Sequence, residues 1–124
     1  MNSIQAPQLL VACLCADWCG ACREYKPLFD SLARKFPNVR FLWVDVEDDA
    51  DLIDPIEVED FPTILIAKEH KSNGFNMLPL FFGTVLPHIE TLERLIQDKM
   101  TAAEHVQVKD AAVKQLVQKL YTKP

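Results

Sequence analysis

The stretch that decides the fold is Leu9–Cys22, which reads LLVACLCADWCGAC. Its first part, Leu9–Ala16, is apolar throughout, which is typical of a central strand covered on both faces. Residues 17–20 interrupt this run, and a helical pattern follows from about Ala21 to Phe36. A buried strand that leads directly into a helix places the residues between them at the N-terminus of that helix.

The predicted helix from Ala21 to Phe36 carries one apolar stripe. Its members recur at helical spacing and are Tyr25, Leu28, Phe29, Leu32, Ala33 and Phe36. We expect Pro27 to kink the helix, and Pro37-Asn38 to end it. Val39–Val46 then reads as a second buried strand. A strand–helix–strand unit implies a parallel pair with a right-handed crossover.

An acidic segment, Glu47–Asp60, contains no Lys or Arg. We interpret it as a solvated loop with a short helix, and a docking surface for a basic partner is the alternative. Strands are predicted at Thr63–Ala67 and Met77–Phe82, joined by the polar connection Lys68–Asn76 with its turn pair Asn73-Gly74.

The end of this hairpin leads into another helix. Pro79 favours an edge position for the strand that contains it. Gly83-Thr84 closes that strand, and Pro87 opens a helix that runs to about Met100. The predicted fold class is α/β, a three-layer sandwich with a mixed central sheet.

Composition agrees with a single globular domain. The chain has 124 residues, of which 49% are hydrophobic and 25% charged. Its formal net charge of −5 argues against a nucleic-acid or membrane-surface binder. Met1–Gln8 has no Lys or Arg, so Leu9–Ala16 fails as a signal peptide. We therefore expect a cytoplasmic protein without a membrane span, whose four cysteines are mostly reduced thiols.

Cys19 and Cys22 lie three residues apart at the first turn of the predicted helix. A helix N-terminus carries partial positive charge and unpaired N–H groups, and both favour a thiolate. Cys19 is therefore predicted to be the attacking sulfur, and Cys22 the thiol that resolves the mixed disulfide. Gly20 and Ala21 keep the intervening turn small enough for a partner chain to approach.

A metal site is the alternative reading of these cysteines, because zinc sites use the same C-x-x-C spacing. Cys13 and Cys15 lie close by, within the apolar strand, and would point to the same face. Bringing all four sulfurs to one ion would break that strand. We therefore predict no metal and no bound cofactor.

Three sequence signals, in this order, resemble the thioredoxin family over about Leu9 to Met100. The first is Trp18-Cys19-Gly20-Ala21-Cys22 after an apolar strand, with Pro27 in the helix. The second is Phe61-Pro62 before a strand, which is similar to the family's cis-proline loop. The third is Gly83 before the last helix, where the family has a glycine beside its substrate groove.

The resemblance implies a thioredoxin fold and a protein-disulfide reductase that acts on protein, peptide or small-molecule disulfides. It implies that Cys19 is the nucleophile and Cys22 the resolving thiol. It further implies a substrate surface and, as electron donor, a flavoprotein of the thioredoxin-reductase type. The substrate-binding residues carried over are Trp18, Gly20, Ala21, Phe61, Pro62 (expected in the cis form) and Gly83.

Three positions depart from the family pattern. Ala21 replaces the proline that typical members have between the cysteines. Cys13 stands where they carry a buried acid, and Trp43 where they carry a lysine. The proton of Cys22 therefore needs another acceptor, and Asp17, Glu24 or water are the candidates. Cys13 is read as a small buried hydrophobe, with a third thiol as the alternative.

Two further classes of function compete with turnover. One is a redox-sensing or peptide-binding module that keeps the groove, and the other is the metal-binding protein considered above. Reduction of a model disulfide such as insulin separates turnover from both.

Residues 101–124 lie beyond the family-like core of residues 1–100, and we expect them to pack on the same domain. Met1–Gln8 is too short for the strand and helix that precede the central strand in typical members. Three versions of the tail stay open: a strand at Val106–Val108 beside Val39–Val46 followed by a helix, one continuous helix, or a helix exchanged between subunits. Asp110 is the predicted cap of a helix whose apolar face is Val113, Leu116, Val117 and Leu120.

Overall fold

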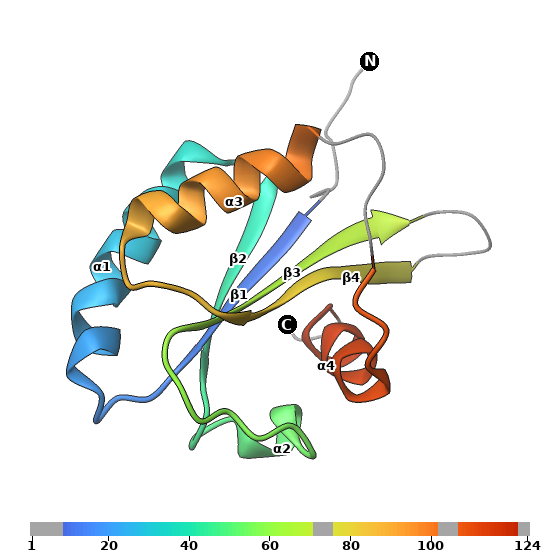
Figure 1. The fold of residues 1–124 in the computed structure, drawn as a ribbon, viewed down its shortest axis with the longest axis horizontal. Coiled ribbons are helices and arrows are strands. Elements are labelled where there is room, and N and C mark those ends of the chain that lie inside the picture. The colour runs from blue at the N-terminus through green and yellow to red at the C-terminus, as the bar shows by residue number, and fades with distance from the viewer. Residues whose placement is uncertain (1–8, 71–75, 102–106, 122–124) are drawn as a thin grey trace.

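A four-stranded mixed sheet forms the centre of the described part of the molecule (Figure 1). The computed structural model describes residues 9–70, 76–101 and 107–121. Its strands are β1 (Leu9–Cys15), β2 (Val39–Asp45), β3 (Thr63–His70) and β4 (Asn76–Thr84). They lie in the order β2-β1-β3-β4. β1 is parallel to β2 and antiparallel to β3, and β3 is antiparallel to β4, which confirms the predicted mixed α/β sheet.

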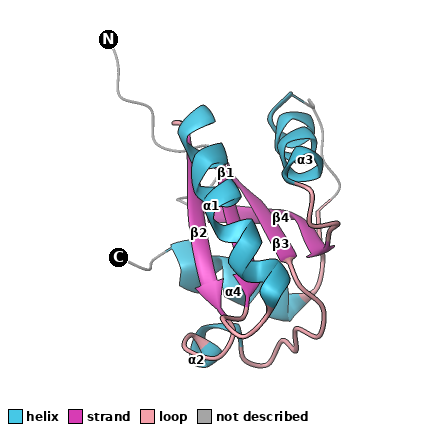
Figure 2. Cartoon of the chain, turned by 90° about the vertical axis from the view of Figure 1, so that its left-hand side faces the viewer, coloured by secondary structure: helices cyan, strands magenta, loops and turns pink. Residues whose placement is uncertain are grey.

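Helices cover both faces of this sheet. They are α1 (Gly20–Lys35), α2 (Ala50–Ile53), α3 (Ile89–Thr101) and α4 (Ala111–Tyr121). In Figure 1, α1 and α3 lie on one side of the sheet and α4 on the other. Figure 2 shows α2 beyond the carboxyl end of β2. None of the helices in the described ranges is long and apolar enough to cross a bilayer.

The central strand β1 explains why Leu9–Ala16 is apolar at every position. Its odd residues, from Leu9 to Cys15, pack in the core beneath α1 and α3. Its even residues, from Leu10 to Leu14, pack in a second core beneath α4. A strand that is buried on both faces needs a continuous apolar run rather than alternation.

The hairpin differs from its prediction in the length of its strands. β3 continues through Lys68–His70, so His70 pairs with Asn76 and the connection is shorter than Lys68–Asn76. The predicted turn pair Asn73-Gly74 lies outside the described residues. Pro79 does lie on an edge strand, beside an irregularity in the register between Ile66 and Ala67. An edge or bulge position tolerates a residue without an N–H.

The C-terminal helix confirms one part of the tail prediction. Val113, Leu116, Val117 and Leu120 are all buried, and the Asp110 carboxylate accepts the N–H of Ala112 at 2.8 Å as the predicted cap. Since α4 packs on the sheet of its own chain, the exchanged helix does not describe this structure.

The strand and the continuous helix are both wrong for the described residues. Residues 107–110 are neither strand nor helix, and Val106 is outside the described ranges. The N–H of Val108 bonds to the carbonyl of Pro79 on β4, at the sheet edge opposite β2. The physical reason is that the tail approaches its helix from the β4 side, where the edge strand offers a free carbonyl.

Candidate active site

Cys19 occupies the N-cap of α1, as the sequence predicts. Its backbone is extended, with φ −86° and ψ 121°, while its carbonyl accepts the N–H of Arg23 at 3.1 Å. Its own N–H is bound by the carbonyl of Ala16 at 3.0 Å. The side chain is a half-buried free thiol. The sulfur therefore lies at the positive end of the helix, where a negative charge is stabilised.

Cys22 lies one turn inside α1 and is 1% exposed. Its sulfur is disulfide-bonded to Cys15, with a Cα–Cα distance of 5.8 Å, and it also accepts the N–H of Ala16 at 3.4 Å. The pair joined in this structure is thus Cys15–Cys22 and not the predicted pair Cys19–Cys22. The reason is packing: Cys15 ends β1 on the face that α1 covers, and Cys22 is on the buried side of α1.

The expectation of mostly reduced thiols is correct for Cys13 and Cys19 and wrong for the other two. The sequence predicts that Cys13 and Cys15 share one face of the strand, but it indicates no role for Cys15. The period of two along the strand puts both sulfurs on one face, but β1 is apolar on both faces, so the period alone does not show which face α1 covers. In the bonded state, Cys15 and Cys22 also lack the thiolate form that binds zinc.

Cys13 is a fully buried thiol beside this disulfide. Its sulfur lies 3.8 Å from that of Cys15. Burial raises the pKa of Cys13 well above its usual range, and the Lys26 ammonium offsets only part of this rise. Burial, and then the neighbouring Cys13, also raise the pKa of Tyr25. Cys13 is therefore a neutral thiol at physiological pH, in agreement with its reading as a small buried hydrophobe.

Trp18 connects the motif to two other segments. Its side chain is 61% exposed, and Nε1 donates to Oε2 of Glu47 at 3.0 Å. Its ring meets the ring of Phe61 edge to face, with centroids 5.5 Å apart. Gly20 is exposed and Ala21 half-buried, so the turn between the cysteines is accessible from this side.

The Phe61-Pro62 loop lies beside this motif, as the resemblance implies. The Phe61–Pro62 peptide bond is cis, which confirms the prediction. The Pro62 carbonyl accepts the N–H of Val85 at 3.1 Å, and Gly83 pairs with Ile64 in the adjoining strands. Three of the predicted substrate-binding positions, Phe61, Pro62 and Gly83, are therefore held together at this end of the sheet. Their role in binding stays a prediction.

A small cavity of about 40 Å³ adjoins Cys22. It is lined by Ala16, Asp17, Cys22, Arg23, Lys26 and Trp43. The Lys26 ammonium lies 5.0 Å from the centroid of the Trp43 ring, a cation–π contact. Of the two side chains considered as proton acceptors for Cys22, Asp17 lines this cavity, whereas Glu24 is exposed on α1 and is not part of the lining.

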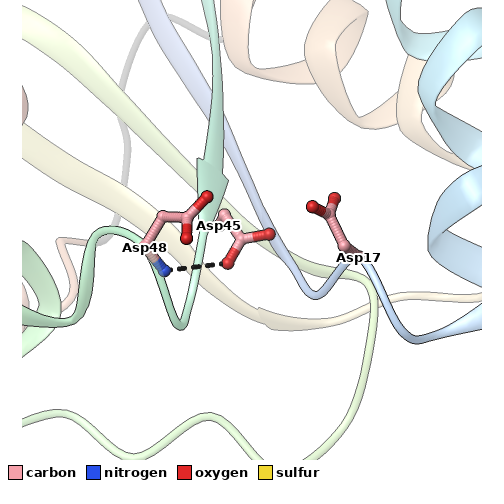
Figure 3. Close-up of side chains that lie close together, drawn as sticks. All are labelled: Asp17, Asp45 and Asp48. Carbon is pink, nitrogen blue, oxygen red and sulfur yellow. Dashed lines mark hydrogen bonds between the residues drawn. The ribbon is translucent and has the colours of Figure 1, made fainter.

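Three carboxylates gather next to the motif, those of Asp17, Asp45 and Asp48 (Figure 3). Their oxygen atoms lie within 4.8 Å of one another. Asp45 Oδ1 accepts the N–H of Asp48 at 3.0 Å and that of Glu47 at 2.9 Å. The Asp48 N–H is the main reason why the pKa of Asp45 is lowered, and the Asp45 charge in turn raises the pKa of Asp48. The arrangement follows from the turn after β2 and gives the site an acidic border.

A second cavity of about 200 Å³ lies where the acidic segment passes the end of the hairpin. Its lining residues are Glu57, Val58, Glu59, Asp60, Thr63, Phe82, Gly83 and Thr84. Thr63 Oγ1 donates to the carbonyl of Asp60 at 2.7 Å, which joins the segment to the first residue of β3. Gly83 therefore borders a hollow with three carboxylates.

Sequence comparison relates the chain to thioredoxins. A sequence model of the Thioredoxin family matches residues 2–77, more than half of the chain. A Thioredoxin H-type of Fagopyrum esculentum is 44% identical over 62 residues, which are 50% of this chain and 53% of that protein. The thioredoxin of Homo sapiens is 42% identical over 67 residues, 54% of this chain and 64% of that protein. The chain thus spans between about half and two thirds of the length of these relatives.

Solved structures agree with the sequence comparison. The thioredoxin of Fasciola hepatica has a TM-score of 0.56 at 27% identity, over 74% of this chain and 81% of that one. The oxidized form of mitochondrial thioredoxin 3 from Saccharomyces cerevisiae has a TM-score of 0.55 at 28% identity, over 76% and 80%. By its family match, its strand order and the cysteines at the start of α1, this chain belongs to the thioredoxin family.

Proposed function

We propose that this protein is a thiol–disulfide oxidoreductase that reduces disulfides of proteins, peptides or small molecules through Cys19 and Cys22. The observation that carries the proposal is the placement of Cys19, a free thiol at the N-cap of α1, one helical turn from the buried sulfur of Cys22. Membership of the thioredoxin family supports the same activity.

The reaction proceeds in two exchanges. The Cys19 thiolate attacks one sulfur of the substrate disulfide, and the other substrate sulfur leaves as a thiolate. The Cys22 thiolate then attacks the Cys19 sulfur and releases the second substrate thiolate. The substrate gains two electrons and two protons, and the enzyme is left with a Cys19–Cys22 disulfide. An electron donor of the thioredoxin-reductase type would restore the dithiol.

The cavity beside Cys22 supports Asp17 as the acceptor of the Cys22 proton. A cavity of about 40 Å³ exceeds the roughly 10–15 Å³ that one water molecule requires, so a water-bridged proton transfer fits this space. Lys26 and Arg23 border the same space and would stabilise the negative charge on the sulfur.

The proposed substrate surface consists of Trp18, Gly20, Ala21, Phe61, Pro62 and Gly83. The ring contact between Trp18 and Phe61 makes one apolar surface beside Cys19. The carboxylates around it favour substrates that carry basic residues. A cytoplasmic location is proposed as well, supported by the free thiols of Cys13 and Cys19.

Reduction of insulin by dithiothreitol tests the activity. The wild-type protein should accelerate it, and Cys19→Ser should abolish the acceleration. Reduced Cys22→Ser, mixed with insulin after dithiothreitol has been removed, should accumulate a mixed disulfide on Cys19. Wild-type protein that leaves the rate unchanged would contradict the proposal.

One observation favours a redox sensor without turnover as the second candidate. The Cys15–Cys22 disulfide leaves Cys19 without its resolving thiol, so that Cys19 acts as a single thiol. A sensor would form a disulfide with a partner but would not accelerate the reduction of insulin, and the same assay therefore separates the two.

A further inference from the structure

We propose that Cys15 is a third redox-active residue, an alternative disulfide partner that takes Cys22 away from Cys19. The proposal rests on the function proposed above, because it assigns a further residue to the same site. It makes Cys22 a branch point between a surface disulfide with Cys19 and a buried disulfide with Cys15.

The geometry places Cys15 within bonding reach of Cys22. Cys15 is the last residue of β1 and is fully buried, and its Cα lies 5.8 Å from that of Cys22. Disulfides usually join residues whose Cα atoms are about 4.4–6.8 Å apart. The two residues belong to the same core cluster, beneath the first turn of α1.

Cys19 is the second possible partner of Cys22, because it lies three residues earlier, at the N-cap of α1. Residues three apart on a helix are neighbours on its surface, so Cys19 and Cys22 are also within reach of each other. Cys19 is half-buried at the N-cap, whereas Cys15 is in the core. Because a sulfur in a disulfide bonds to one other sulfur only, a bond of Cys22 to Cys15 frees Cys19.

The two oxidised forms convert by one balanced exchange. The Cys15 thiolate attacks the Cys22 sulfur of a Cys19–Cys22 disulfide, the bond between the sulfurs of Cys22 and Cys19 breaks, and Cys19 leaves as a thiolate. The proton lost by Cys15 is taken up by Cys19 or by water. No electron leaves the protein, so the exchange needs no further oxidant or reductant.

The exchange changes what the oxidised protein can do. When Cys19 and Cys22 are joined in a disulfide, neither cysteine of the motif is a free thiol, so neither can attack another disulfide. With the Cys15–Cys22 disulfide, the Cys19 thiolate can attack a second disulfide, R–S–S–R, to give Cys19–S–S–R and release one RS⁻. Cys22 is occupied and cannot resolve that mixed disulfide. The adduct should therefore persist until the buried bond reopens.

Cys13 is the matched control for Cys15. Both lie on the same face of β1 and their sulfur atoms are 3.8 Å apart, but the sulfur bonded to Cys22 is that of Cys15. Cys13 lies two residues before Cys15 in β1, and its burial favours the neutral thiol. We therefore expect the Cys15–Cys22 disulfide to form in Cys13→Ala and to be lost in Cys15→Ala.

The test is a disulfide map of the oxidised wild-type protein. The chain is oxidised with oxidised dithiothreitol, held at about pH 8 so that exchange reaches equilibrium, quenched with acid, then unfolded in guanidinium chloride and alkylated with N-ethylmaleimide at mildly acidic pH, where thiol exchange is slow. A protease that cleaves before aspartate separates residues 1–16 from residues 17–29, because Asp17 lies between Cys15 and Cys19 and the next Asp is Asp30. A Cys19–Cys22 disulfide stays within one peptide, whereas Cys15–Cys22 links the two.

The expected result is a linked pair of peptides with alkylated Cys13 and Cys19. It should persist in Cys13→Ala and disappear in Cys15→Ala. An independent readout is the number of thiols that react with Ellman's reagent in the folded, oxidised protein, which should fall from about one in the wild type to none in Cys15→Ala.

The inference is overturned if the wild-type map shows Cys19–Cys22 alone with both thiols of peptide 1–16 alkylated. It is also overturned if Cys13→Ala removes the link. The wild-type map decides the matter even if a variant fails to fold. A protein that reduces insulin but lacks the link overturns this inference alone, and one that fails to reduce insulin overturns the proposed function whatever its map.

Discussion

Cys19 and Cys22 experience different surroundings although they lie three residues apart. Cys19 is at the N-cap with its sulfur open to one side, and Cys22 is buried against the end of β1. The helix terminus favours a charged sulfur at the first position, while burial protects the second from solvent and reagents. These surroundings support the proposed roles, attack by Cys19 and resolution by Cys22.

In the reduced protein, iodoacetamide should therefore label Cys19 before Cys22 between about pH 6 and 8. The ratio of the two labels, measured by peptide mass spectrometry at short times, should exceed roughly tenfold, because Cys22 is 1% exposed. Faster labelling of Cys22 would show that the roles are reversed.

Asp17→Asn should lower the turnover of insulin by about tenfold to a hundredfold. The reason is that Asp17 lines the cavity beside Cys22. General bases typically contribute about 10²–10⁴-fold to a rate, and water in the cavity would replace part of the lost contribution. The loss should fall on kcat rather than KM, because proton removal from Cys22 follows substrate binding. Glu24→Gln, a change at an exposed position of α1, is the matched control and should retain turnover. Equal effects of the two changes would remove Asp17 from the proton route.

At the scale of elements, local turns and caps hold the site in place. The turn after β2 is built on Asp45, whose carboxylate accepts two backbone N–H groups. The turn positions Glu47, which in turn binds Trp18. The hydrogen bonds of Asp45 therefore help to orient the Trp18 ring, although Asp45 lies outside the Trp18–Cys22 motif.

Asp45→Ala should reduce the free energy of unfolding by about 1 kcal/mol, because two N–H groups lose their acceptor. Asp45→Asn should cost less, since its amide oxygen accepts the same bonds. The folded-state pKa of Asp45 is lowered, so its charge stabilises the fold above the unfolded pKa of about 3.9 and this contribution is lost as pH falls through the folded pKa. In urea titrations, the difference between the wild type and Asp45→Asn should therefore shrink from pH 7 to pH 3. A difference that grows on acidification would contradict this account.

The buried face of α4 should matter far more than its exposed face. Leu116→Ala should lower the free energy of unfolding by about 2–5 kcal/mol, because a fully buried leucine leaves a cavity against the sheet. Gln115→Ala, one residue earlier and exposed, should change it by less than about 0.5 kcal/mol. Urea denaturation of both variants checks the pair, and similar values for the two would show that α4 does not seal the core.

At the scale of the whole molecule, α4 completes the third layer of the sandwich. It covers the face of the sheet opposite α1 and α3 (Figure 1), where it buries the even residues of β1. The strand that carries Cys13 and Cys15 on one face thus depends on α4 for the burial of its other face.

Truncation after Met100 should therefore abolish cooperative thermal unfolding. It removes four buried side chains, each worth about 1.5–3 kcal/mol, from a domain whose total stability is on the order of 5–15 kcal/mol. Circular dichroism melts and insulin reduction, measured side by side, check this expectation. A truncated chain with an unchanged melting temperature and activity would show that residues 101–124 are dispensable.

Patterns within single segments of the sequence determined where several strands and helices of this protein begin and end. The apolar run contains the central strand Leu9–Cys15, Cys19 is the N-cap of α1, and Asp110 caps α4. The Phe61–Pro62 bond is cis, as the family resemblance implies. Each of the first three depends on the spacing of neighbours along the chain, and such spacing can be read directly from a sequence.

Only the tertiary structure decided which sulfur Cys22 meets and which sheet edge the tail follows. Cys15 became its partner because β1 ends beneath the first turn of α1, and Val108 bonds to Pro79 on β4 rather than to β2. The physical reason is the same in both cases. These contacts join segments whose approach is set by how the helices pack on the sheet, and no periodicity within either segment encodes that approach.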